Sequence, residues 1–313
     1  MGWMGWALLG LVVFALAFVA LWQWAVATRA TWLLDEVDSW FTSGMARHVA
    51  GPVSLGEQPE QQLHVWVPAS AAKGDAPRPV LVFIHGGGWS SGSPFEYGFV
   101  ARNFANEGFV TVNLGYRLGN DGKFPAMLED SAAGVKWVYE NIADHGGDPD
   151  RIYLMGHSAG AYNAVMLGLD RQWLGREGLP DNVLKGVVGL AGPCDFLPLD
   201  GEGVERAFGD APDLAATQPI NFARADAPPM LLLTGGADVT VKPRNSSALA
   251  TRMSVLGVAM EPVILDGMDH AGSIVTMARP FDRDRRAKDA VLAFLRRPAA
   301  DQSASVPVQA ETR

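Results

Sequence analysis

Cysteine and basic residues are both scarce in this chain of 313 residues. The single cysteine, Cys194, cannot form an intramolecular disulfide or a cysteine-rich metal site, and it carries no information about redox compartment. It follows an apolar segment, so we expect a small buried side chain there. Lysine and arginine number 25 against 34 aspartates and glutamates, a net charge of −9. Nucleic-acid binding is disfavoured, because phosphates are bound by basic surfaces.

Residues 2–26 have no charged side chain, and Gln23 is their only strongly polar one. A run of this length can span a bilayer. Tryptophans flank its apolar centre, as in the interfacial belts of membrane proteins; they are Trp3, Trp6, Trp22 and Trp24. We expect residues 1–27 to be an uncleaved single-pass transmembrane anchor, with the remainder outside the cytoplasm. A cleavable signal peptide is the alternative, since residues 25–27 read Ala-Val-Ala, but no Lys or Arg precedes the apolar run.

The rest of the chain divides into three parts. Residues 28–60 mix aromatic and acidic residues and then become rich in Gly, Pro and Gln, which predicts a short helix or cap segment and a linker. Residues 61–297 alternate short apolar runs with segments of helical spacing, which predicts an α/β domain: a mainly parallel central sheet with helices on both faces. Within it, residues 194–228 are irregular and form a candidate lid. Residues 298–313 are polar and aperiodic, as in disordered tails.

One short motif organises the domain. Residues 152–155 are apolar and predict a buried strand, residues 161–169 have helical composition, and Gly-His-Ser-Ala-Gly lies between them at residues 156–160. This is the G-x-S-x-G pattern of a nucleophile elbow, in which a serine occupies a strained turn between strand and helix. Glycines two residues before and after Ser158 suit that turn because side chains there would collide. Ser158 is therefore the candidate nucleophile, and the helix that follows points its positive end at a developing oxyanion.

A second motif, His-Gly-Gly-Gly-Trp at residues 85–89, follows the apolar strand expected at residues 80–84. Three consecutive glycines leave backbone amides that a ligand can approach closely. A phosphate-binding loop is excluded, because Trp89 and Ser90 stand where that motif needs lysine and a hydroxyl residue. The loop is therefore a candidate source of oxyanion donors. We interpret His85 as a residue that fixes this loop and not as a base.

An activated serine needs a base and a carboxylate that orients it. In α/β-hydrolases these partners follow the serine in the order acid, then histidine, each beyond the end of a strand. Asp238 follows the strand expected at residues 229–234, and His270 follows the one expected at residues 261–265. Asp195 follows an earlier strand, and Asp269 is too near His270 to come from a separate strand. We therefore expect a Ser158–Asp238–His270 triad.

Together these motifs resemble the α/β-hydrolase esterases of the hormone-sensitive-lipase-like, carboxylesterase type. The resemblance covers roughly residues 60–297. It implies an α/β-hydrolase fold and hydrolysis of carboxylic esters through an acyl-enzyme, with no metal or other cofactor. It also implies that the amides of Gly87, Gly88 and Ala159 donate to the oxyanion. The long N-terminal cap of many such esterases is not evident here.

Two other functions remain open from the sequence. His-Gly-Gly-x-Trp at residues 85–89 also fits kynurenine-formamidase-like amide hydrolases, and a membrane-anchored binding protein could use a catalytically inactive hydrolase scaffold. A prolyl-oligopeptidase-like peptidase is disfavoured, because no propeller-sized region precedes the domain. The partner expected is a small-molecule ester. Its acyl chain should be short to medium, because the segment 194–228 has few large apolar side chains to form a wall. The sequence does not specify an oligomeric state.

Overall fold

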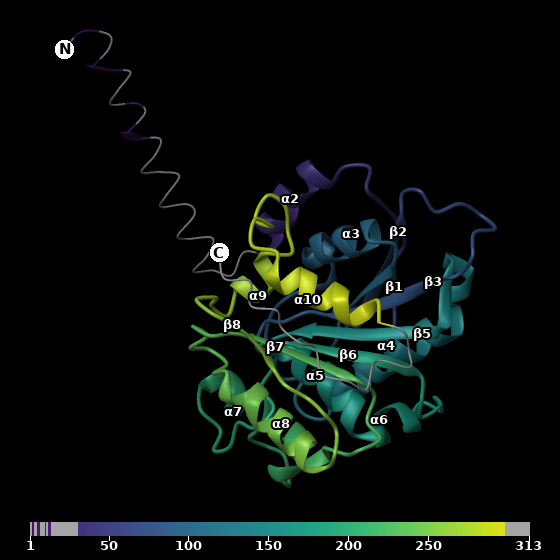
Figure 1. Ribbon diagram of the computed structural model, residues 1–313, viewed down its shortest axis with the longest axis vertical. Helices are drawn as coiled ribbons and strands as arrows, with labels where there is room; N and C mark the ends of the chain where they lie inside the picture. The colour runs from purple at the N-terminus through teal and green to yellow at the C-terminus, as the bar shows by residue number, and fades with distance from the viewer. Residues whose placement is uncertain (1, 3–4, 7–9, 11, 14–30, 298–313) are drawn as a thin grey trace.

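A computed structural model describes residues 31–297 together with residues 2, 5–6, 10, 12 and 13 (Figure 1). The expected tail at residues 298–313 and nearly all of the expected anchor at residues 1–27 lie outside the described residues. No helix within the described part of the chain is both long enough and apolar enough to cross a bilayer.

Eight strands form one sheet, in the order β1-β2-β4-β3-β5-β6-β7-β8. β1 and β2 pair antiparallel, as do β2 and β4, and every later pairing is parallel. The mainly parallel sheet predicted from the sequence is therefore confirmed. The strands span Ala46–Ser54, Gln62–Pro68, Arg78–Ile84, Val110–Leu114, Gly147–His157, Leu184–Leu190, Met230–Gly235 and Val263–Leu265, from β1 to β8.

Helices cover both faces of the sheet because alternate residues of its central strands point to opposite sides. In β3, Val80, Val82 and Ile84 join one apolar cluster, whereas Leu81 and Phe83 join the other. The first cluster is completed by α4 (Ala126–Asn141), α5 (Ala159–Leu169), α6 (Arg171–Arg176) and α8 (Arg244–Val255). The second is completed by α3 (Gly98–Asn106), α9 (Gly272–Val275) and α10 (Arg286–Leu295) (Figure 1).

Residues 28–60 contain the short helix expected there, but a strand, β1, takes the place of the linker expected after it. α2 (Thr31–Thr42) packs against α3, and β1 pairs with β2 along the antiparallel edge of the sheet. Two features of β1 prevent its recognition as a strand from the sequence. It contains Gly51 and Pro52, which are uncommon inside central strands but tolerated at an edge, and most of its side chains are exposed or half-buried. The sheet therefore begins before residue 61.

The segment 194–228 contains more regular structure than the sequence indicates. It holds α7 (Glu202–Phe208) and two 3-10 turns, η3 (Ala215–Thr217) and η4 (Pro219–Phe222). It is also fastened to the domain: the Tyr162 hydroxyl donates to the Thr217 carbonyl at 2.9 Å, and the Phe208 ring is fully buried. The buried part of this segment is thus held in place against α5.

Candidate active site

The three predicted catalytic residues follow the carboxyl ends of three parallel strands. Ser158 comes directly after β5, Asp238 follows β7, and His270 follows β8. Neighbouring parallel strands end at the same edge of the sheet, so residues that are 112 and 32 positions apart in the chain meet there.

Ser158 occupies a strained turn. Its φ is 55° and its ψ −119°, and α5 begins at the next residue. A Cβ atom on Gly156 would lie 2.1 Å from the carbonyl oxygen of Gly160, and one on Gly160 would lie 2.1 Å from that of Ile84. Only glycine fits at either position, because contacts this short are never tolerated. The turn therefore has the geometry of a nucleophile elbow.

His270 bridges the other two residues. Its Nδ1 lies 2.8 Å from Oδ2 of Asp238, and its Nε2 lies 2.9 Å from Oγ of Ser158. The Asp238 carboxylate is fully buried, whereas the His270 side chain has 19% of its surface exposed and Ser158 is half-buried. With Nδ1–H donated to the carboxylate, Nε2 is left with a lone pair for the serine hydroxyl.

Asp238 is held by its own loop. The amides of Thr240 and Val241 donate to its Oδ1 at 2.9 and 2.8 Å, which leaves Oδ2 to face His270. The competing acids are placed elsewhere. Asp269 accepts the amide of Gly272 at 2.7 Å, and Asp195 is held through its own amide, which donates to Asn245. Neither carboxylate forms the contact with His270 that Asp238 forms.

The glycine loop lies beside the elbow. Gly87 and Gly88 have φ values of 125° and 60°, and a Cβ on Gly87 would lie 2.0 Å from the Ser91 carbonyl oxygen. A Cβ atom on Gly86 would lie 3.3 Å from the Cβ atom of Ser158. Within the described residues, the amides of Gly87, Gly88 and Ala159 have no acceptor. An N–H group without an acceptor can donate to a developing oxyanion.

His85 is buried behind this loop. Its Nδ1–H donates to the Gly86 carbonyl at 2.8 Å, and its ring stacks on Tyr116 at 4.7 Å between centroids. Burial lowers the pKa of His85 to about 4, so it is neutral at physiological pH. These contacts agree with the interpretation of His85 as a residue that fixes the loop.

Residues 63–253, more than half of the chain, match the family model described as BD-FAE. This chain belongs to the BD-FAE family. The family is a hormone-sensitive-lipase-like group of α/β-hydrolases, in agreement with the resemblance read from the motifs.

Curated relatives of this BD-FAE protein include a probable isoprenylcysteine α-carbonyl methylesterase of Arabidopsis thaliana. The two are 27% identical over 71% of this chain and 51% of the relative. Esterase LipC of Mycobacterium tuberculosis is also 27% identical, over 72% of this chain and 60% of its own. The chain thus spans only 51% and 60% of the length of these two relatives. Esterase B from Lactobacillus Rhamnosis has a similar fold, with a TM-score of 0.72 at 19% identity over 92% of this chain and 95% of its own.

His157 belongs to the site as well, although the sequence analysis did not single it out. Its Nε2–H donates to the backbone carbonyl of His270 at 3.2 Å, and the two rings lie 5.0 Å apart. The Ser273 hydroxyl donates to the same carbonyl at 2.8 Å. Only the position of His157 next to Ser158 in the sequence could have suggested a role, because its hydrogen bond is to a residue 113 positions away in the chain.

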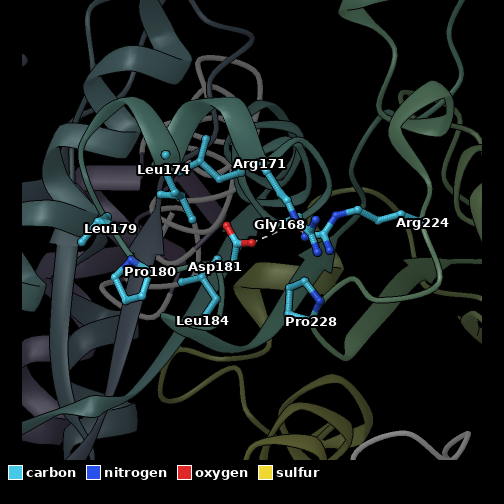
Figure 2. Close-up of a pocket in the computed structure, with 11 residues that line it drawn as sticks. Gly168, Arg171, Leu174, Leu179, Pro180, Asp181, Leu184, Arg224 and Pro228 are labelled. Atoms are coloured by element: carbon cyan, nitrogen blue, oxygen red, sulfur yellow. Dashed lines mark hydrogen bonds and ion pairs between the residues drawn. The ribbon is translucent and has the colours of Figure 1, made fainter.

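Two cavities of this BD-FAE protein lie away from Ser158, Asp238 and His270. One, at the far end of α5 from Ser158, has a volume of about 10 Å³, room for at most one water. Figure 2 shows Arg171, Asp181 and Arg224 around it. The other, of about 440 Å³, is lined by residues at the amino ends of β3 and β5 and by the end of α10. Neither is lined by any of these three residues.

No group of three or more His, Cys, Asp or Glu side chains in the described ranges is placed to hold a metal ion.

Proposed function

We propose that this protein is a serine hydrolase that cleaves carboxylic esters through an acyl-enzyme. The observation that carries the proposal is the bridge of His270 between Asp238 and Ser158 at the end of a nucleophile elbow. The esterase names of its relatives support the same reaction class.

The proposed reaction has two steps. Ser158 Oγ attacks the ester carbonyl carbon while its proton passes to Nε2 of His270, and the charge on the carbonyl oxygen is stabilised by the amides of Gly87, Gly88 and Ala159. Collapse of the tetrahedral intermediate breaks the ester C–O bond, and the leaving alcohol takes the proton from Nε2. Water then attacks the acyl-enzyme with His270 as base, which releases the acid and restores Ser158.

Asp238 has two tasks in this scheme. It fixes the imidazole tautomer that leaves Nε2 unprotonated, and it stabilises the imidazolium that forms during each attack. Because the carboxylate is sealed from solvent, its interaction with the imidazolium is weakly screened.

Substitution of the nucleophile tests the proposal. Ser158→Ala should lower kcat on p-nitrophenyl esters by roughly 10³-fold or more and abolish labelling by a fluorophosphonate, with an unchanged melting temperature. Ser273→Ala, also a serine of this site region, is the control and should still be labelled. Near-wild-type turnover by Ser158→Ala would refute the serine-hydrolase mechanism. N-formylkynurenine, assayed in parallel, distinguishes esters from formamides.

We also propose that residues 1–27 anchor the protein in a membrane, with the catalytic domain outside the cytoplasm. The uncharged run at residues 2–26 and its flanking tryptophans support this. The full chain should sediment with membranes and resist extraction by high salt. An intact mass lacking residues 1–27 would instead show a cleaved signal peptide.

A further inference from the structure

α2 buries polar side chains and exposes apolar ones, the opposite of an ordinary surface helix. Such a helix ordinarily buries its apolar side chains and exposes its polar ones. In α2 the fully buried side chains are Asp38 and Thr42, whereas its exposed side chains include Trp32, Trp40 and Phe41.

The buried side of α2 is held by charge and hydrogen bonds. Arg102 of α3 donates to Oδ2 of Asp38 from both Nε and Nη2, at 3.0 and 2.8 Å. Oδ1 of Asp38 accepts from the Asn103 amide at 2.9 Å and from the backbone amide of Arg279 at 2.8 Å. Asp35 adds a second ion pair to Arg102 at 2.7 Å. The buried carboxylate is tolerated because four N–H groups of Arg102, Asn103 and Arg279 donate to it, and these contacts fix α2 to the domain.

The outer side of α2 is apolar and open. Trp32, Trp40 and Phe41 expose 53%, 68% and 52% of their surfaces. Leu33 and Val37 lie on the same arc at helical spacing and are half-buried. The charged side chain on this arc is Glu36, and it accepts the indole N–H of Trp40 at 3.2 Å. Isolated exposed apolar residues are ordinary, but Trp40 lies at the centre of this outer half of the helix, with Trp32 and Phe41 at its two edges. Three large aromatics exposed across one half of a helix indicate a binding surface.

We propose that this outer side of α2 lies on the surface of the lipid bilayer that holds residues 1–27. The inference rests on the membrane anchor proposed above. Between Ala27 and Thr31 the chain can extend by at most about 14 Å, so the start of α2 must remain close to the bilayer boundary. Tryptophan favours that boundary, where its ring is in an apolar layer and its N–H meets polar groups. An amphipathic helix with an aromatic apolar side lies in the plane of the interface.

This placement fixes how the catalytic domain faces the membrane. α2 is bound through Asp38 to α3 and to Arg279, and Arg279 lies only nine residues after His270 in the chain. A domain attached by a flexible tether would rotate freely, whereas one seated on α2 presents the same side to lipid at all times.

A single-cysteine label tests the contact in the full chain. Trp40→Cys carries the label, and the native Cys194 does not react because it is buried and its thiol pKa is raised to about 12 by that burial. Val255→Cys is the matched control: it is an exposed apolar residue of α8, on the opposite face of the sheet (Figure 1). A bimane fluorophore is attached to each, and the protein is reconstituted in vesicles of phosphatidylcholine and phosphatidylglycerol. Quenching is measured with lipids that carry a shallow nitroxide and with aqueous iodide.

The label at position 40 should be quenched strongly by the nitroxide lipid and weakly by iodide, and the label at position 255 should show the reverse. Strong quenching by iodide at both positions would overturn the inference. Protection at position 40 from both quenchers would also overturn it, because a second copy or the chain's own residues would then cover α2.

Vesicle flotation separates the two proposals: a chain that does not float refutes the anchor, whereas one that floats with position 40 in water refutes only the α2 contact. Fluorophosphonate labelling of Ser158 reports the esterase mechanism independently.

Discussion

His157 donates a hydrogen bond from Nε2 to the backbone carbonyl of His270 at 3.2 Å. The residue before Ser158, the proposed nucleophile, thus holds the main chain of the residue proposed as its base. Ser158 and His270 come from loops 112 residues apart, and this bond fixes one loop relative to the other. We therefore interpret His157 as a positioning residue that does not itself exchange a proton with substrate.

Removal of that bond should lower kcat more than it changes KM. His157→Phe keeps a planar ring but loses the donor, and we expect a fall in kcat of roughly 10-fold to 100-fold, the scale of small misplacements of catalytic groups. His157→Gln retains an N–H donor and should recover part of the loss. Equal activities of the two variants would show that the hydrogen bond has no positioning role. Melting temperatures check that both variants are folded.

Asp238 should be the sensitive acid of the site. Asp238→Asn should lower kcat by about 10⁴-fold, because the amide favours the imidazole tautomer with its proton on Nε2. Asp195→Asn and Asp269→Asn are matched controls, and both should retain most of the activity, since the hydrogen bonds that hold these residues go to Asn245 and Gly272 and not to His270. A larger effect at Asp195 than at Asp238 would reassign the acid.

Asp38 should contribute strongly to stability. Asp38→Ala leaves the Arg102 guanidinium without its fully buried partner, and we expect the free energy of unfolding in urea to fall by about 3–5 kcal/mol. Glu36→Ala, on the exposed side of the same helix, should change it by no more than about 0.5 kcal/mol. Similar values for the two variants would contradict the view that α2 is fixed through Asp38.

We expect kcat/KM to rise with acyl-chain length only for short chains and not to rise further for longer ones. Each methylene buried in an apolar pocket contributes roughly 0.8 kcal/mol, and only while a wall remains to contact it. In the segment 194–228, Phe208 is already packed against Trp89 and Tyr162, with ring centroids 4.8 and 5.0 Å apart, which leaves less wall for substrate. We expect kcat/KM on p-nitrophenyl esters to be highest at about two to eight acyl carbons. Activity that still rises with long acyl chains would indicate a lipase.

Acid should destabilise the fold through buried neutral histidines. Burial, with the nearby His48, lowers the pKa of His64 to about 4 from an ordinary value of 6.5. Between pH 6.5 and 4 the unfolded chain therefore binds a proton at His64 that the folded chain does not, so the free energy of unfolding rises with pH in this window. His64→Phe should reduce that slope by the contribution of one proton. An unchanged slope in urea unfolding from pH 4 to 7 would show that His64 is protonated in the folded state.

Local patterns in the sequence determined most of the sheet and the residues of the candidate site. Continuous apolar runs marked the buried strands: the strands expected at residues 80–84 and 229–234 correspond to β3, Arg78–Ile84, and β7, Met230–Gly235. The elbow around Ser158 could be found because its glycines and its strand and helix are contiguous in the chain. Asp238 and His270 could be proposed from their order and their positions after strands, since parallel strands bring such loops to one edge.

Only the tertiary structure decided what depends on distant partners. β1 is mostly exposed and interrupted by Gly51 and Pro52, so nothing within it marks a strand until β2 supplies the hydrogen bonds. α2 buries the carboxylate of Asp38 because Arg102 and the backbone amide of Arg279 lie opposite it, a condition that the periodicity of α2 cannot reveal. The contact between His157 and the carbonyl of His270 likewise exists only once two loops meet. Contacts within one segment are encoded locally, whereas these arise only when the fold brings separate segments together.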